Sequence, residues 1–178
     1  MTVIHANDPT TKVLSLLYEQ RKDVKMHITE KSTNGAVRRA LCADDTIMML
    51  GHGNMYGLFS KPNNKGAFLR LLIDDSHAQF LRGKTCIGIW CHADEFAYKY
   101  KLHGLFSGMI ISELQEAIDY NIPATKEEID AEMEKFTLRL KNCIENYALE
   151  EVPQRMRELD DTKSELTRFN YNNLFYFE

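Results

Sequence analysis

Two short polar segments contain the side chains of this chain that are best suited to chemistry. One is Gly51-His52-Gly53 and the other begins at Cys91, and each directly follows an apolar run. An imidazole beside a thiol can act as its general base and convert it into a nucleophile. A cysteine needs less activation than a serine, because a small fraction of it is already thiolate at neutral pH. The pattern therefore predicts a nucleophile–base pair of Cys91 and His52.

The two apolar runs, residues 45–50 and 84–90, are predicted to be buried parallel strands. Both are continuous apolar stretches bounded by polar residues, which is typical of strands that are covered on both faces. The carboxyl ends of neighbouring parallel strands lie at one edge of a sheet, where open α/β proteins place their ligands. We therefore expect His52 and Cys91 to emerge together at that edge.

Composition indicates a globular protein with a sizeable core. The chain has 178 residues, of which 44% are hydrophobic, and a formal net charge of −4. No stretch is strongly basic, so nucleic acid is not an expected partner. The apolar runs are too short to cross a membrane, and the first residues lack the apolar segment of a signal peptide. We therefore expect no membrane partner and a cytoplasmic location.

The four cysteines, Cys42, Cys86, Cys91 and Cys143, are predicted to be free thiols. Their spacings match neither a zinc-binding motif nor a disulfide framework, so we expect no metal and no other cofactor. Cys86 lies within a predicted strand and Cys143 on the apolar side of a predicted helix. A place in the core is favoured for both.

Strands and helices alternate over the first 120 residues, which predicts an α/β three-layer sandwich with a mainly parallel sheet. We expect one domain over residues 1–178, with a core at 11–120 and a mostly helical C-terminal extension at 121–178. Within it we predict a loose lead-in at 1–10, strands at 12–18 and 23–30, and a short helix at 36–42. A loop is predicted at 60–66 and a helix at 104–120, and the strand at 23–30 is expected at or near the sheet edge.

The last third of the chain is predicted to be helical. Thr125 and Glu128 form a capping box that opens a long helix, along which Ile129 and Met133 repeat at helical spacing. The charged residues 154–166 are also predicted to be helical. The aromatic tail, residues 169–178, is expected to pair with an edge of the sheet or to cover it.

The order of these motifs resembles the caspase–hemoglobinase clan (clan CD) of cysteine peptidases, which includes caspases, metacaspases, clostripain, gingipain and CHAT-domain proteins. The matching parts are IMMLGHG at 47–53, LIDDSHAQFLRGKTCIGIWCHAD at 72–94, and a helix expected to begin at GLFSG, 104–108. The resemblance covers residues 11–120. It implies a caspase-like fold and a small intracellular thiol protease that cleaves a protein or peptide substrate through an acyl-enzyme.

The resemblance also implies residue roles. Cys91 would be the nucleophile and His52 the general base, and the backbone N–H groups of Gly53 and Cys91 would stabilise the oxyanion. Beside these roles, His92, Asp94 and Glu95 are candidate substrate contacts, with either acid offering a pocket for a basic side chain; a cap on the loop or on the following helix is an equally weighted role for Asp94. Metacaspases carry an acid two residues before the cysteine, whereas this chain has an isoleucine at position 89. The primary specificity of the clan is therefore not implied.

Other interpretations of the same residues stay open. A lone cysteine is more often buried and inert than reactive, and a fold does not by itself imply an activity. The second hypothesis is a catalytically inactive caspase-like or flavodoxin-like α/β domain that acts as a binding or regulatory module. The third is a metal-dependent hydrolase using Cys91, His92 and His103, whose spacing is not that of a recognised zinc site. An exposed sheet edge would allow a homodimer.

Two further features lie near Cys91. Trp90, the only tryptophan, is expected in the core. Phe96, Tyr98 and Tyr100 recur with period two, which predicts a strand edge or the wall of a pocket.

Overall fold

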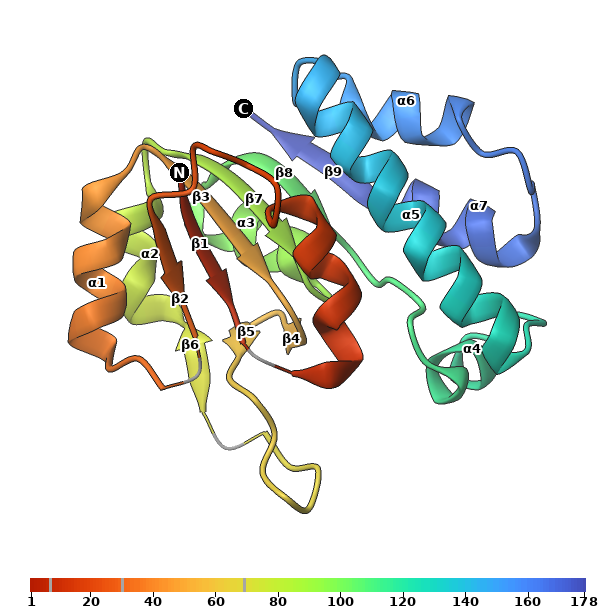
Figure 1. The fold of residues 1–178 in the computed structure, drawn as a ribbon, viewed down its shortest axis with the longest axis horizontal. Coiled ribbons are helices and arrows are strands. Elements are labelled where there is room, and N and C mark those ends of the chain that lie inside the picture. Colours follow the sequence, from red (N-terminus) through yellow and green to blue (C-terminus); the bar gives the residue numbers. More distant parts are fainter. Residues whose placement is uncertain (7, 30, 69) are drawn as a thin grey trace.

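The computed structural model describes residues 1–6, 8–29, 31–68 and 70–178, and it shows an α/β fold around a central sheet (Figure 1). Within the described residues the sheet has six strands in the order β2-β1-β3-β7-β8-β9. The neighbours from β2 to β8 pair in parallel, and β9 pairs antiparallel to β8. The predicted mainly parallel sheet is therefore confirmed. In sheet order the strands are Met26–Ile28, Thr2–His5, Thr46–Leu50, Thr85–Ile89, His103–Ser107 and Leu174–Phe177.

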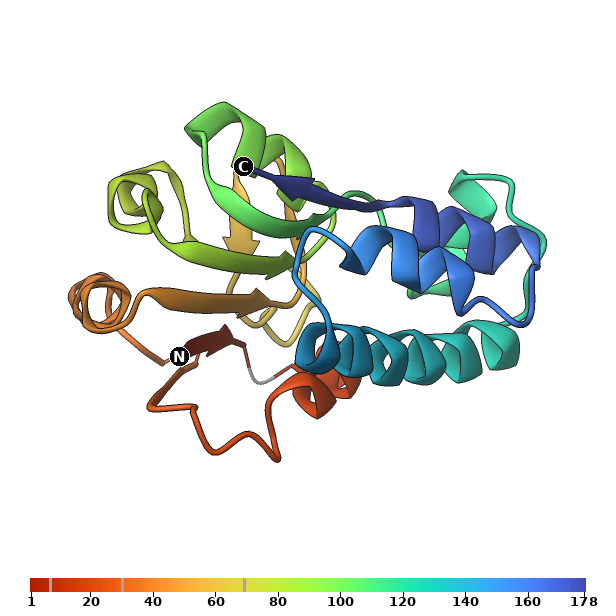
Figure 2. The same ribbon diagram turned by 90° about the horizontal axis from the view of Figure 1, so that it is seen from above.

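Helices cover both faces of the sheet, as the view in Figure 2 shows. One face is covered by α1 (Asn34–Ala43), η2 (Asp75–His77), α2 (Ala78–Leu81) and α3 (Ala93–Tyr100). The other is covered by the 3-10 helix η1 (Pro9–Leu17), α5 (Lys126–Asn146), α6 (Val152–Glu158) and α7 (Glu165–Asn172), with α4 (Leu114–Asp119) beside α5. Strand side chains alternate between the two faces, so that Met48 belongs to the core on the α5 side of the sheet and Met49 to the core on the α1 side. The fold thus has three layers.

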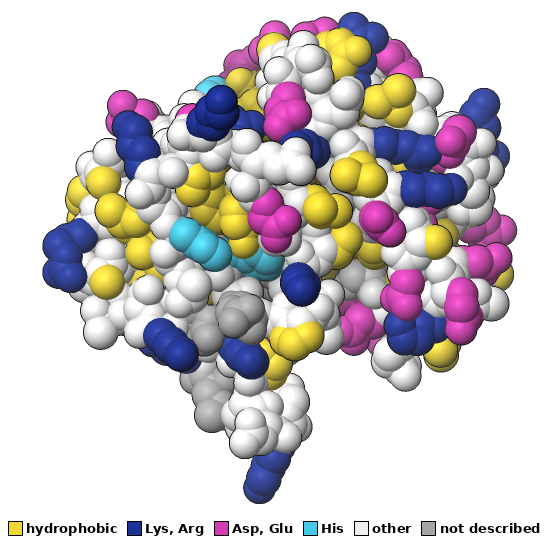
Figure 3. Space-filling model, viewed as in Figure 1, with side chains coloured by type: hydrophobic (Ala, Val, Ile, Leu, Met, Phe, Trp, Pro, Cys, Tyr) yellow, Lys and Arg dark blue, Asp and Glu magenta, His cyan; other side chains and the backbone are white. Residues whose placement is uncertain are grey.

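A small antiparallel sheet follows β3 and carries the loop that protrudes from the molecule (Figure 1). It consists of β4 (Gly53–Asn54), β5 (Gly57–Phe59) and β6 (Leu71–Ile73). The loop predicted at 60–66 is confirmed, and its tip carries a positively charged side chain in Figure 3. Elsewhere on the face shown in Figure 3, acidic and basic side chains are interspersed.

The first strand of the sheet lies where a loose lead-in was predicted. β1 pairs with both β2 and β3, so the prediction for residues 1–10 is wrong. Its polar ends are buried with partners, since Thr2 Oγ1 donates to an Asp44 carboxylate oxygen at 2.8 Å and His5 Nδ1 lies 3.0 Å from Tyr18 Oη. A strand of four residues with polar side chains at both ends shows no apolar alternation, so only its pairing reveals it.

The segment predicted as a strand at 12–18 instead lies mostly in η1, so this prediction is also wrong. Asp8 is the N-cap of η1 and accepts a hydrogen bond from the N–H of Thr10 at 3.1 Å. Pro9 follows the cap, and its fixed φ suits the first turn of a helix. A short apolar run does not distinguish a strand from a buried helical turn, so these start signals were the better guide.

The helix predicted at 104–120 is a strand, a loop and a helix, namely β8, residues 108–113 and α4. A β-carbon on Gly104 would lie 1.9 Å from the Cys86 carbonyl oxygen, so the backbones of β7 and β8 approach too closely there for any side chain. This contact between distant segments overrides the helical spacing of the apolar residues. The aromatic run from Phe96 to Tyr100 lies in α3, so the predicted strand edge is wrong.

Other local predictions are confirmed. The strand predicted at 23–30 appears as the edge strand β2, and its expected last residue, Glu30, lies outside the described residues. Thr33 caps α1, and the Thr125–Glu128 capping box opens α5. The aromatic tail forms β9 against β8, while the charged segment at 154–166 is divided between α6 and α7. The sheet therefore includes β1, before residue 11, and β9, after residue 120.

None of the described helices combines the length and apolar character that crossing a bilayer requires.

Candidate active site

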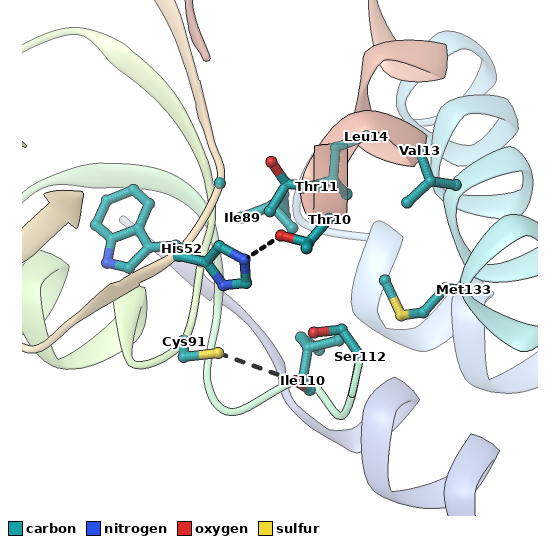
Figure 4. Close-up of a pocket in the computed structure, with 12 residues that line it drawn as sticks. Thr10, Thr11, Val13, Leu14, His52, Ile89, Cys91, Ile110, Ser112 and Met133 are labelled. Atoms are coloured by element: carbon teal, nitrogen blue, oxygen red, sulfur yellow. Dashed lines mark hydrogen bonds between the residues drawn. The ribbon is translucent and has the colours of Figure 1, made fainter. Parts of the chain in front are cut away.

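β3 and β7 bring His52 and Cys91 to the same edge of the sheet. The two strands are adjacent and parallel, with Leu50 opposite Ile89 at their carboxyl ends. The N–H of Gly51 donates to the Ile89 carbonyl at 3.1 Å, so the segments that follow the two strands begin side by side. His52 and Cys91 then line one cavity, shown in Figure 4, as the strand order led us to expect.

The cavity lies between η1, the ends of the two strands, the loop before α4, and α5. Its volume is about 30 Å³, and most of its surface is apolar. The helical layer on one face of the sheet contributes to it through both η1 and α5, each of which supplies part of the wall. The lining residues are Thr10, Thr11, Val13, Leu14, Gly51, His52, Ile89, Trp90, Cys91, Ile110, Ser112 and Met133.

His52 is held by a threonine and a buried carboxylate. Thr10 Oγ1 lies 2.7 Å from His52 Nε2 and donates to Asp8 Oδ1 at 3.0 Å. Asp8 is 5% exposed, and its second oxygen lies 4.0 Å from Nε2. Because a carboxylate only accepts, the Thr10 hydroxyl gives its proton to Asp8 and accepts one from Nε2. Nδ1 is then the basic nitrogen of the neutral ring.

This tautomer suits a base for Cys91. In Figure 4 the Nδ1 side of the His52 ring faces the side of the cavity on which Cys91 lies, while Nε2 is turned to Thr10. An imidazole whose outer nitrogen is tied to a carboxylate-linked hydroxyl is fixed in orientation and stabilised as imidazolium.

Cys91 is present as a thiol in this arrangement. Its sulfur lies 3.9 Å from the Ile110 carbonyl oxygen, to which it donates. Burial, followed by the negative charge of Glu116, raises the pKa of the Cys91 thiol to about 12. Among the described residues, the Cys91 sulfur forms its hydrogen bond with the Ile110 carbonyl and none with His52. The thiol must therefore turn from Ile110 toward His52 before a proton can be transferred.

Gly53 is packed against the tryptophan that precedes the cysteine. A β-carbon there would lie 2.2 Å from Trp90 Cδ1, so the position requires glycine. The N–H of Phe59 donates to the His52 carbonyl at 2.8 Å, and alternation in the antiparallel ladder then turns the N–H of Gly53 away from β5. A backbone N–H that is not used by the hairpin is the type of donor that an oxyanion site needs.

Trp90 and Ser107 hold the cysteine loop in place. Trp90 is 2% exposed and its Nε1 donates to the Asn54 carbonyl at 3.2 Å, so its predicted place in the core is confirmed. The buried hydroxyl of Ser107 accepts from the Trp90 N–H at 3.0 Å and donates to the Trp90 carbonyl at 2.8 Å. These contacts fix the backbone directly before Cys91.

The structure places the three predicted substrate-binding residues at the start of α3, with His92 as its N-cap and Asp94 and Glu95 on its first turn, outside the cavity lining. His92 adopts a left-handed backbone with φ of 66°, and its Nδ1 lies 2.9 Å from Glu95 Oε1. Burial raises the pKa of the Asp94 carboxyl, whose Oδ1 is buried with no hydrogen-bond partner among the described residues. His92, Asp94 and Glu95 therefore cluster with one another and not with the cavity between Cys91 and His52.

The residues of the metal hypothesis do not converge. His103 begins β8, whereas Cys91 follows the end of the parallel strand β7, so the two lie toward opposite edges of the sheet. The His103 ring packs against Tyr176. Within the described residues, no group of three or more histidine, cysteine or acidic side chains could hold a metal ion. The hypothesis of a metal-dependent hydrolase thus loses its geometric basis.

Sequence reasoning missed the residues that support the pair. Asp8 before Pro9 was a helix start signal, and it would have placed Thr10 on the first turn of a helix after β1. Asn170 had no comparable signal. Its side chain accepts from the Ile111 N–H at 2.8 Å and donates to the Ile111 carbonyl at 3.0 Å, across 59 residues of sequence. Asn170 therefore fixes the backbone at Ile111, next to Ile110, whose carbonyl contacts Cys91.

Comparison of the chain with models of known protein families finds no match, and comparison with curated proteins finds none either. The function is therefore inferred from the fold and from the geometry of this cavity.

Proposed function

We propose that this protein is a caspase-like cysteine peptidase with Cys91 as the nucleophile and His52 as the general base. The observation that carries the proposal is that both side chains line one cavity at the carboxyl ends of adjacent parallel strands. The link from His52 through Thr10 to the buried Asp8 adds to it, because such a link orients the ring and stabilises its charged form. A cytoplasmic location, where cysteines stay reduced, suits this chemistry.

The reaction begins with proton transfer from Cys91 Sγ to His52 Nδ1. The thiolate attacks the carbonyl carbon of the substrate, and the negative charge moves to the carbonyl oxygen, for which the N–H groups of Gly53 and Cys91 are the candidate donors. The imidazolium then gives its proton to the leaving amine, and a thioester acyl-enzyme remains. Water, deprotonated by His52, hydrolyses the thioester and releases the acid and the free thiol.

Thr10 and Asp8 act on His52 and not on the substrate. When Nδ1 accepts a proton, the ring becomes positively charged, and its Nε2–H is directed to a hydroxyl that is bonded to a carboxylate. These two hydrogen bonds, from His52 to Thr10 and from Thr10 to Asp8, stabilise the imidazolium and keep the ring from turning. An imidazolium beside Cys91 in turn lowers the pKa of the thiol, opposing the effect of burial.

The test is the search for new chain ends in a proteome-derived peptide mixture incubated with the protein, read by mass spectrometry. Cys91→Ala should abolish every cleavage while the circular dichroism spectrum stays unchanged. Cys42→Ala, which removes an exposed thiol on α1, is the matched control and should retain activity. Cleavage that persists in Cys91→Ala would refute the assignment of the nucleophile.

A second function, a binding or regulatory module without catalysis, is favoured by one observation. The Cys91 thiol donates a hydrogen bond to the Ile110 carbonyl and none to His52. The two functions differ in their alkylation by iodoacetamide at neutral pH. A peptidase should be modified first at Cys91, and the modification should slow in His52→Ala. A binding module should be modified first at the exposed Cys42, whatever residue stands at position 52.

A further inference from the structure

The cavity beside Cys91 has no charged wall. Apart from His52 and Cys91, the described residues that line it carry no ionisable side chain. Its walls are mainly aliphatic, with hydroxyl groups only from Thr10, Thr11 and Ser112. The aliphatic and thioether members are Val13, Leu14, Ile89, Ile110 and Met133.

Among the described residues, the charged side chains near the cavity do not line it: Asp8 lies 4.0 Å from His52 Nε2 and is bridged to it by Thr10, and others lie farther out along the same cleft. A neighbouring hollow of about 490 Å³ shares Thr10 and Ser112 with the cavity, and it is lined by Glu113, Lys126 and Asp130. Lys126 Nζ is paired with Asp130 there. The acidic residues of α3 are not available to the cavity either, because neither Asp94 nor Glu95 lines it. A charged substrate side chain that entered the cavity would therefore lose its hydration, and the only lining group able to carry a compensating charge is His52, which is already linked to Asp8 through Thr10.

The cavity is also small. Its volume of about 30 Å³ is well below the ~150 Å³ of an engineered apolar cavity that admits benzene. Met133 projects from α5 into the side of the cavity opposite His52 in Figure 4, and it is 8% exposed. Room is therefore left for a short aliphatic side chain, and the methionine limits its length.

We propose that this cavity receives the substrate side chain on the acyl side of the scissile bond, and that it selects short uncharged side chains such as alanine or valine. The inference rests on the proposed function and deepens it by naming a substrate class. Ile89, two residues before the nucleophile, forms part of the floor, and Met133 sets the depth. The larger hollow beyond Ser112, which carries charged side chains, accommodates the more distant substrate residues.

The test uses peptidyl acyloxymethyl ketones that differ only in the residue next to the ketone: alanine, valine, phenylalanine, aspartate or arginine. The Cys91 thiolate displaces the carboxylate of such a probe and forms a thioether, so labelling reports recognition without turnover. Mass spectrometry of the intact protein gives the rates. We expect alanine and valine probes to label Cys91 at least tenfold faster than aspartate and arginine probes, since a single methylene in an apolar pocket already discriminates by about 10–200-fold.

Met133→Ala should shift the preference toward phenylalanine by about tenfold or more, because it deepens the cavity. Leu138→Ala is the matched control, since this residue lies on the same helix, is 47% exposed and does not line the cavity. Val13→Ala widens the same cavity from η1 and serves if Met133→Ala fails to fold.

The outcomes separate the two proposals. Faster labelling by the arginine or aspartate probe overturns the apolar specificity and leaves the peptidase standing. An unchanged preference in both cavity variants also overturns it. If no probe labels Cys91 in the native protein while iodoacetamide alkylates it after denaturation, the proposed peptidase activity is refuted, and the proposed specificity with it.

Discussion

Replacing Thr10 by valine removes one hydroxyl group and nearly nothing else. The hydroxyl lies 2.7 Å from His52 Nε2 and 3.0 Å from Asp8 Oδ1, so it is the direct link between the base and the buried carboxylate. The N-cap of η1 survives the change, because Asp8 accepts from the backbone N–H of Thr10. Valine has almost the shape of threonine, so the cavity wall also remains.

The expected loss follows from the charge that His52 acquires. A hydrogen bond to a charged group contributes about 1.5–3 kcal/mol. In the proposed mechanism His52 gains its proton from Cys91 on the way to the transition state, so this energy is lost from the activation barrier. At 1.36 kcal/mol for each factor of ten, kcat should fall by about 10- to 150-fold. KM should change little, since the hydroxyl is turned to His52 and Asp8.

The assay is steady-state hydrolysis of the best peptide found in the cleavage screen. Thr11→Val is the matched control, because Thr11 lines the same cavity but its hydroxyl lies 3.2 Å from His5 Nε2 and not near His52. It should keep kcat within about twofold. A Thr10→Val enzyme whose kcat equals that of the Thr11→Val enzyme would show that Asp8 and Thr10 do not orient the base.

Three further changes test the framework of the site. Asn170→Leu should lower the free energy of unfolding by about 2–4 kcal/mol in urea, because the Ile111 N–H and carbonyl are left buried and unpaired; a loss below ~1 kcal/mol contradicts this role of Asn170. Gly53→Ala should destabilise by about 1–3 kcal/mol and shift the fluorescence of Trp90, whose ring a β-carbon would meet at 2.2 Å, and an unchanged spectrum argues against this packing. Burial lowers the pKa of His5 to about 4, so only the unfolded chain gains this proton between pH 6.5 and 4, and stability should fall by about 3 kcal/mol as the pH drops through that range. His5→Gln should flatten this slope, and an equally steep slope in the variant assigns the acid sensitivity to other groups.

The local sequence determined the two strands, β3 and β7, that lead into His52 and Cys91. Each is a continuous apolar run that ends at a polar residue, and such runs are buried wherever a parallel sheet forms. The long helix α5 was equally readable, because its capping box and apolar stripe are short-range patterns. The placement of His52 and Cys91 at one edge followed from these strands, since neighbouring parallel strands end together.

The strands β1 and β8, which carry polar residues or a glycine, could not be predicted from the sequence. β1 is short, and its threonine and histidine are satisfied by Asp44 and Tyr18, both distant in sequence. β8 contains Gly104, whose position is dictated by the close approach of the neighbouring strand. In both cases the energy that forms the strand comes from pairing across the sheet, and no pattern within the segment records it.

The sequence by itself determined the α/β class of the fold and the edge of the sheet at which His52 and Cys91, the pair in our proposal, come together. Only the tertiary structure decided what surrounds that pair. Thr10 reaches His52 across 42 residues, and Met133 closes the cavity from a helix of the last third of the chain. The tertiary structure also directs the Cys91 thiol toward the Ile110 carbonyl and keeps the acidic residues of α3 out of the cavity. These are contacts between segments that are far apart in the chain, and their geometry depends on how the layers pack rather than on any local preference.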